Sequence, residues 1–135
     1  MDKKVFILDI DETICKAPKK EDGSFDYSNA IPFQKTIDKI NELAIEGHRI
    51  DLFTARGMRT FNGNVEKINE YHRPILEQWL KEHNVTYHSL EFGKPWARDY
   101  FIVDDRNITI NQFLETKSED YPSIIKHNTS FNYEK

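Results

Sequence analysis

Short apolar runs alternate along this chain with segments in which apolar residues recur every three or four positions. The runs predict β-strands at residues 5–9, 50–54, 85–92 and 100–104. The helical spacing predicts helices that begin near residue 32, after residue 64 and at residue 110. Strands that alternate with helices form parallel βαβ units, so we expect an α/β fold: a three-layer α/β/α, Rossmann-like arrangement around a parallel sheet.

Several residues refine this pattern. Residues 5–9 are almost continuously apolar before the acids, which is typical of a strand buried on both faces. Gly47 stands where a helix C-terminal cap is expected, and Pro74 is expected to restart or kink its helix. Residues 16–31 are polar and contain Gly and Pro, which predicts a mobile loop or small hairpin that forms a flap.

Length and charge limit the classes of protein that fit. A chain of 135 residues supports one domain, so we expect a single domain over residues 1–135. The net charge of -4 argues against a nucleic-acid or anionic-membrane partner. The weakly periodic residues 115–135 are expected to pack late on the core, to contact a neighbouring subunit or to remain mobile, and the sequence leaves these alternatives open.

Cysteine usage and the N-terminus indicate the compartment. Cys15 is the single cysteine and cannot form an internal disulfide, which fits a reducing cytoplasm. It is expected to be a packed side chain and not a nucleophile. The N-terminal apolar run is too short for a signal peptide or a membrane span. We therefore expect a soluble cytoplasmic protein that either acts alone or forms a homo-oligomer.

Polar side chains follow three of the predicted strands. Asp9 and Asp11 come after the first run, Thr54 closes the second, and Asp104 with Asp105 ends the last. A fourth motif, FGKPW, supplies Lys94. The carboxyl ends of parallel strands meet at one edge of an open sheet, so we expect these groups to converge at the topological switch point.

This set of side chains has a definite chemistry. Clustered carboxylates without His or Cys select a hard cation, and Mg²⁺ suits a site shared between acids and a phosphate. Lys94 would supply a positive charge, while the Thr54 hydroxyl and the backbone amides beside it would hold phosphate oxygens. A carboxylate that faces a phosphate can attack it to form an aspartyl-phosphate, and a second acid can serve both steps as acid and base.

The motifs DIDET, Thr54, Lys94 and Asp104-Asp105 resemble the four motifs of the haloacid dehalogenase (HAD) superfamily of phosphohydrolases. The resemblance spans residues 5–105 and implies a HAD-like fold with a flap in place of a cap domain. It implies Asp9 as nucleophile, Asp11 as general acid/base, and Thr54 and Lys94 as phosphate-holding groups. It also implies that the metal is held by Asp9, Asp11 through its backbone carbonyl, and Asp104, with Asp105 nearby.

A narrower resemblance is carried by the strings FTARGMRTFNGNVEKIN, PILEQWLKEHNV, FGKPW and VDDR. They are similar to small HAD proteins described as capsule or surface-polysaccharide biosynthesis phosphatases. Ile10, Ala55 and Arg56 are candidate substrate contacts, although Arg56 could equally be a salt-bridged loop residue. Glu12 departs from the commonest pattern, in which Gly stands at this position, and should stiffen the turn.

Three functions remain open at this point. The first is a Mg²⁺-dependent phosphatase for a small phosphorylated metabolite, such as a sugar, polyol or amino-alcohol phosphate. The second is a receiver-like phospho-acceptor signalling domain, which uses Asp, Thr, Lys and Mg²⁺ on a similar sheet but lacks the Asp-x-Asp of the first turn. The third is a HAD phosphatase that acts on a macromolecular phosphate, since a site without a cap is either open to large substrates or covered by a neighbouring subunit.

Overall fold

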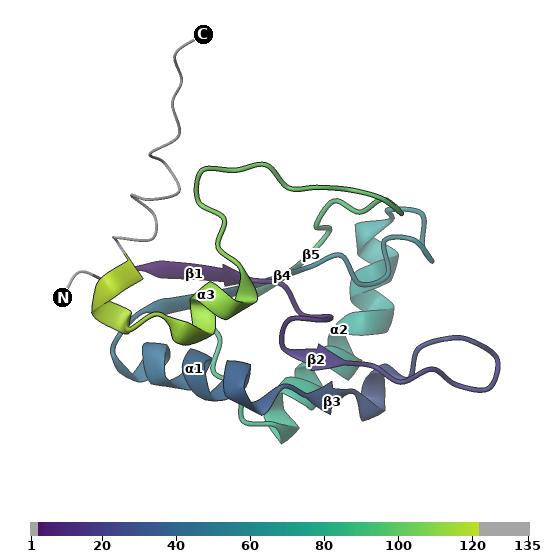
Figure 1. The fold of residues 1–135 in the computed structure, drawn as a ribbon. Helices are drawn as coiled ribbons and strands as arrows, with labels where there is room; N and C mark the ends of the chain where they lie inside the picture. Colours follow the sequence, from purple (N-terminus) through teal and green to yellow (C-terminus); the bar gives the residue numbers. More distant parts are fainter. Residues whose placement is uncertain (1–2, 122–135) are drawn as a thin grey trace, which may run out of the picture. The chain divides into compact units, whose positions relative to one another are not determined.

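Three parallel strands in the order β1-β4-β5 form the main sheet (Figure 1). The structure is a computed structural model that describes residues 3–121. The strands and the helices that follow the first two are β1 (Val5–Leu8), α1 (Gln34–Ile45), β4 (Arg49–Thr54), α2 (Val65–Glu82) and β5 (Ser89–Phe92). The predicted fold class is confirmed as an α/β, Rossmann-like fold, because both strand pairs are parallel and helices flank the sheet.

The described residues fall into two compact units, one that ends at Ala97 and one that begins at Arg98. The larger unit holds the sheet, α1, α2 and a small hairpin. The smaller unit holds the described helices α3 (Ile110–Glu115) and η2 (Ser118–Asp120). A single domain over residues 1–135 stays a prediction, and residues 122–135 of the predicted C-terminal segment lie outside the described residues.

The core lies against one face of the sheet. Leu52 pairs in register with Leu8 on one side and Leu90 on the other, and all three side chains are buried. Val5 and Ile7 point to the opposite face and are 55% and 69% exposed. The prediction that this first strand is buried on both faces is therefore wrong, because an apolar residue does not require burial and successive strand side chains alternate between faces.

Helix α2 passes through Pro74 without interruption, so the predicted restart of the helix is wrong, whereas the alternative of a kink stays a prediction. Proline in a helix interior costs about 3 kcal/mol. Ile68 before the proline and Leu76 and Leu80 after it are all fully buried, and each such side chain contributes roughly 1.5–3 kcal/mol. One continuous apolar face thus outweighs the local defect. Asn64 caps the start of α2 by accepting from the Lys67 amide at 3.2 Å.

The predicted strand at residues 100–104 does not form. Between β5 and α3 the chain has no helix or strand, and Phe101 and Val103 are 90% and 96% exposed. A strand needs a backbone partner, and in the part of the chain that the structure describes these residues have no ladder. The third predicted strand is also shorter than expected, because the Val85 amide donates to the Leu80 carbonyl at 3.0 Å at the end of α2.

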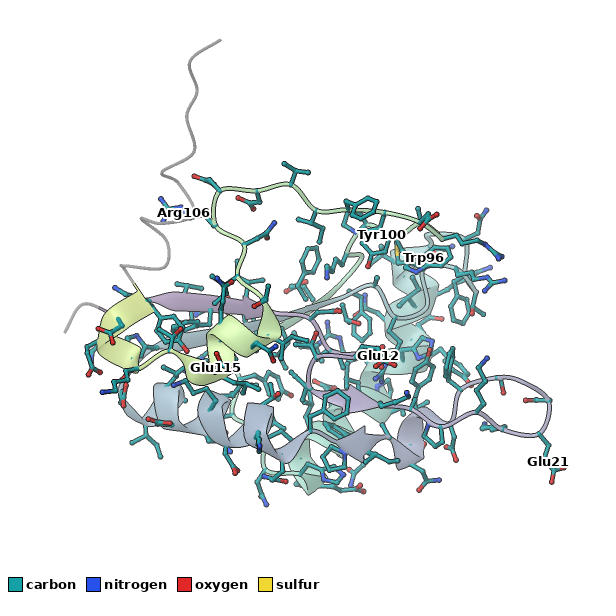
Figure 2. The ribbon with its side chains drawn as sticks, viewed as in Figure 1. Glu12, Glu21, Trp96, Tyr100, Arg106 and Glu115 are labelled. Carbon is teal, nitrogen blue, oxygen red and sulfur yellow. The ribbon has the colours of Figure 1, made fainter. Side chains whose placement is uncertain are left out.

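The predicted hairpin at residues 16–31 is present. Strands β2 (Cys15–Lys16) and β3 (Ile31–Pro32) pair antiparallel, and the short helix η1 (Tyr27–Asn29) lies between them. Its return arm is anchored to α2, because the Trp79 indole donates to the Ala30 carbonyl at 2.9 Å. Figure 2 shows Glu21 at the outer end of this loop. The segment therefore joins the core at its base and extends away from it at its tip.

Candidate functional site

The chain turns sharply after β1, and this turn carries Asp9 and Asp11. The carbonyl of Ile10 accepts from the Ile14 amide at 2.8 Å, which closes the turn. Glu12, which is labelled in Figure 2, has a φ of 66°. This value lies in the left-handed region, where glycine is unstrained. The departure from Gly noted in the sequence therefore falls at a position where any side chain is strained. Ile10 is 0% exposed as a whole residue, backbone included, so its role as a substrate contact stays a prediction.

Lys94 follows β5 and returns to the carboxyl end of the sheet. Its amide donates to the Thr54 carbonyl at 3.2 Å, which continues the pairing of β4 and β5. Its ammonium Nζ lies 3.6 Å from Oδ1 of Asp9, and the two side chains are 16% and 30% exposed. Burial raises the pKa of Asp9 above its usual value, and the charge of Lys94 opposes this shift. Two residues far apart in the sequence thus form an accessible pair of opposite charges.

Thr54 is 1% exposed at the end of β4. Its hydroxyl oxygen accepts from the Arg56 amide at 3.0 Å, which fixes the start of the loop after the strand. The hydroxyl proton is the remaining donor. Ala55 lies between them, and its carbonyl accepts from the Met58 amide at 3.0 Å. The structure therefore brings Thr54 to the same strand ends as Lys94, with its oxygen already engaged.

Arg56 forms an ion pair with Asp11 at these strand ends. Its Nε donates to Oδ2 of Asp11 at 3.1 Å and its Nη2 donates to Oδ1 at 2.9 Å, a bidentate pair. The Arg56 side chain is 1% exposed, whereas that of Asp11 is 35% exposed. Of the two alternatives left open by the sequence, Arg56 is a salt-bridged residue here, and its partner is the acid that was expected to transfer protons.

The hairpin covers the guanidinium of Arg56. The ring centroid of Tyr27 lies 4.1 Å from Cζ of Arg56, at stacking distance for a cation on an aromatic face. Tyr27 belongs to η1, and η1 packs on α2. The segment predicted as a flap thus contributes a side chain to the surroundings of Asp11. Sequence reasoning gave Tyr27 no role, and its only signal was that it is one of two aromatic residues, with Phe25, in a mostly polar loop.

Cys15 lies beside the same pair and is fully buried. Its Sγ is 3.9 Å from Oδ1 of Asp11 and 3.9 Å from Nη2 of Arg56. Burial first, and then the charge of Asp11, raise the pKa of the thiol to about 12. A thiol with this pKa is not a nucleophile near neutral pH. This agrees with the prediction that Cys15 is a packed side chain.

His72 is a second residue that the sequence did not indicate. It lies in α2, is 3% exposed, and its ring meets that of Tyr27 edge to face at 5.2 Å. Its Nδ1 is buried and has no hydrogen-bond partner within the described structure. Burial first, and then the charge of Arg56, lower its pKa to about 4, while the charge of Asp11 opposes them. The imidazole is therefore neutral around pH 7.

Asp104 and Asp105 belong to the smaller unit, which is described by itself. Oδ1 of Asp104 accepts from the Arg106 amide at 3.0 Å, and this bond lowers the pKa of Asp104. Oδ2 of Asp105 lies 3.7 Å from Nε of Arg106. Within residues 3–121 no three Asp, Glu, His or Cys side chains form a group suited to a metal ion. The predicted metal ligands are thus divided between the two units, and their meeting stays a prediction.

The parallel sheet makes this an α/β, Rossmann-like protein. The charged groups at the carboxyl ends of its strands form the candidate site. No protein-family model matches the chain, and a search of curated proteins found no match. The chain is similar to a Vibrio cholerae protein whose crystal structure was determined as a structural-genomics target. The identity is 34%, the match covers 92% of this chain and 98% of that one, and the TM-score is 0.81. The chain therefore belongs to the same family as that protein.

No helix within residues 3–121 has the length and apolar character needed to cross a membrane.

Proposed function

We propose that this protein is a Mg²⁺-dependent phosphomonoesterase of the HAD superfamily. Its substrate would be a small phosphorylated metabolite, such as a sugar, polyol or amino-alcohol phosphate, used in capsular or surface-polysaccharide biosynthesis in the cytoplasm. The observation that carries the proposal is the approach of the Lys94 ammonium to within 3.6 Å of the Asp9 carboxylate, at the carboxyl ends of the strands. This pair offers a nucleophile beside a cation that can hold a phosphate oxygen.

The proposed reaction has two steps. The cycle begins with Asp11 protonated. In the first step a carboxylate oxygen of Asp9 bonds to phosphorus, the bond from phosphorus to the leaving oxygen breaks, and that oxygen takes the proton of Asp11. In the second, water bonds to phosphorus, gives its proton to Asp11, and the bond to Asp9 breaks to release phosphate. Asp9 and Asp11 are thus restored, and each displacement is easier than a single direct one.

The proposal includes a bound Mg²⁺ beside Asp9. Asp9 is 30% exposed, so a cation has access to it, whereas both oxygens of Asp11 are occupied by Arg56. The donors that the resemblance implies, and that we propose, are the Asp9 carboxylate, the backbone carbonyl of Asp11 and the Asp104 carboxylate, with Asp105 nearby. When bound, Mg²⁺ would offset the negative charge of the acids and the phosphate.

The test is phosphate release by the purified protein from a panel of phosphorylated sugars, polyols and amino alcohols. We expect hydrolysis of some members in Mg²⁺, loss of activity with EDTA, and recovery when Mg²⁺ is restored. Asp9→Asn serves as the control for contaminating phosphatases and should be inactive. Full activity in metal-free buffer would contradict the metal requirement, and no hydrolysis of any panel member would contradict the substrate class.

A further inference from the structure

The pair of Arg56 and Asp11 is unequal in its access to solvent. The guanidinium side chain is 1% exposed, and the carboxylate side chain is 35% exposed. A substrate or a water molecule at the strand ends can therefore reach Asp11 without reaching Arg56. The route by which Arg56 can orient a bound molecule is therefore the carboxylate that it holds. This argues against Arg56 as a direct substrate contact.

The guanidinium is fixed from two directions. Its Nε and Nη2 define the plane of the bidentate contact with Asp11, at 3.1 and 2.9 Å. The Tyr27 ring lies over it, 4.1 Å from Cζ. A planar fork that is held both by its edge and by its face has little freedom to rotate, so the two oxygens of Asp11 are also fixed in direction.

We infer that Arg56 is a positioning residue that aims the carboxylate of Asp11 for the second step of the proposed reaction, and that Tyr27 of the hairpin holds Arg56 in place. This inference rests on the proposed function. The bidentate contact uses one lone pair on each oxygen of Asp11. It fixes the direction of the remaining lone pairs, and one of these can accept a proton from water. The hairpin thus acts on the chemistry through Arg56, without touching the substrate.

The experiment uses p-nitrophenyl phosphate. Its leaving group departs without a proton, so only the second step of the reaction depends on Asp11. Arg56→Lys keeps the charge but cannot form the bidentate, stacked contact. We expect kcat to fall about 100-fold, the loss that a misplacement of about 1 Å can cause. KM should fall with it and kcat/KM should stay close to wild type, because only the second step is slowed. Rapid-quench mass spectrometry should show the phosphoryl adduct accumulating on Asp9, because its hydrolysis is the step that is slowed.

Tyr27 provides a second test on a less buried residue. Tyr27→Leu should lower kcat about tenfold through loss of the cation–aromatic contact and should accumulate the same adduct. Tyr27→Phe keeps the ring and should retain wild-type kcat. The matched control is Arg49→Gln, which removes another Arg–Asp pair, Arg49 Nε to Asp51 Oδ1 at 2.8 Å, on a 53% exposed side chain. It should leave kcat and KM unchanged.

The outcomes separate this inference from the proposed function. Activity that persists in Asp9→Asn would overturn the proposed function itself. If wild type is active and depends on Asp9, a raised KM with unchanged kcat in Arg56→Lys would show that Arg56 binds substrate. Unchanged kcat in both Arg56→Lys and Tyr27→Leu would show that the pair is structural only. If thermal unfolding shows that Arg56→Lys does not fold, the two Tyr27 variants decide.

Discussion

Lowering the pH should destabilise this protein through one histidine. His72 is 3% exposed, and its ring contacts those of Tyr27, Phe61 and Tyr71. Burial lowers its pKa from 6.5 to about 4. The charge of Arg56 acts in the same direction as burial, whereas that of Asp11 opposes it.

The sign follows from the protons bound in each state. Between pH 6.5 and about 4 the unfolded chain holds a proton on His72 and the folded protein does not. The free energy of unfolding therefore rises with pH across this window, and the stability that neutral His72 contributes is lost as the pH falls. Integrated between about pH 7 and about pH 4.5, the free energy of unfolding lost through His72 is about 2 kcal/mol. His72 causes no further loss once the pH is well below 4, because it is then protonated in the folded protein too.

The comparison is between wild type and His72→Phe, which keeps an aromatic ring but cannot be protonated. Urea unfolding of both proteins at about pH 7 and about pH 4.5 gives four free energies. Wild type should lose about 2 kcal/mol more than the variant on acidification, since the other titrating groups are common to both. An equal loss in the two proteins would show that His72 is protonated in the folded state as readily as in the unfolded chain, and would refute its buried, neutral placement.

Two further predictions concern Lys94 and Gly57. Lys94→Ala should raise KM and lower kcat for an aryl phosphate, since the ammonium offsets negative charge on both the phosphate and Asp9. Lys94→Arg should restore little of this activity. If the steady-state kinetics of Lys94→Ala match wild type, Lys94 lies outside the site. Gly57→Ala should lower the free energy of unfolding by more than Gly23→Ala. Both glycines have positive φ, 84° and 87° respectively. Only at Gly57 would the new Cβ meet another side chain, at 2.8 Å from Cδ2 of His72. The φ penalty of about 1–2 kcal/mol is common to both variants, so equal losses by urea unfolding would show that His72 yields freely.

The sequence predicted those features that depend on local pattern. Strand β4 and helix α1 lie close to their expected positions because period-2 and period-3.6 apolar spacing reports directly on one buried face. The approach of Lys94 to Asp9 also followed from the sequence, because parallel strands place their carboxyl ends at one edge. In both cases a local or topological rule was sufficient.

The features that the sequence did not predict depend on tertiary contacts. Arg56 pairs with Asp11 across two strand ends, and the hairpin places Tyr27 over the guanidinium. No spacing rule describes either contact. Likewise the run at residues 100–104 has strand composition but no partner in the described structure, and β propensity reflects fit to a sheet more than a backbone preference. Composition therefore predicted a strand where pairing does not occur.

The central claim is that a phosphoryl group passes through Asp9, and the direct test is to detect that adduct. Wild type, Asp9→Asn and Asp11→Asn are each mixed with acetyl phosphate in Mg²⁺, quenched rapidly and mapped by mass spectrometry. We expect a short-lived adduct on Asp9 in wild type and none in Asp9→Asn. In Asp11→Asn the Asp9 adduct should persist, because general acid–base assistance is worth ~10²–10⁴-fold. A long-lived adduct on Asp105, or on any residue other than Asp9, would contradict the account and favour a receiver-like phospho-acceptor.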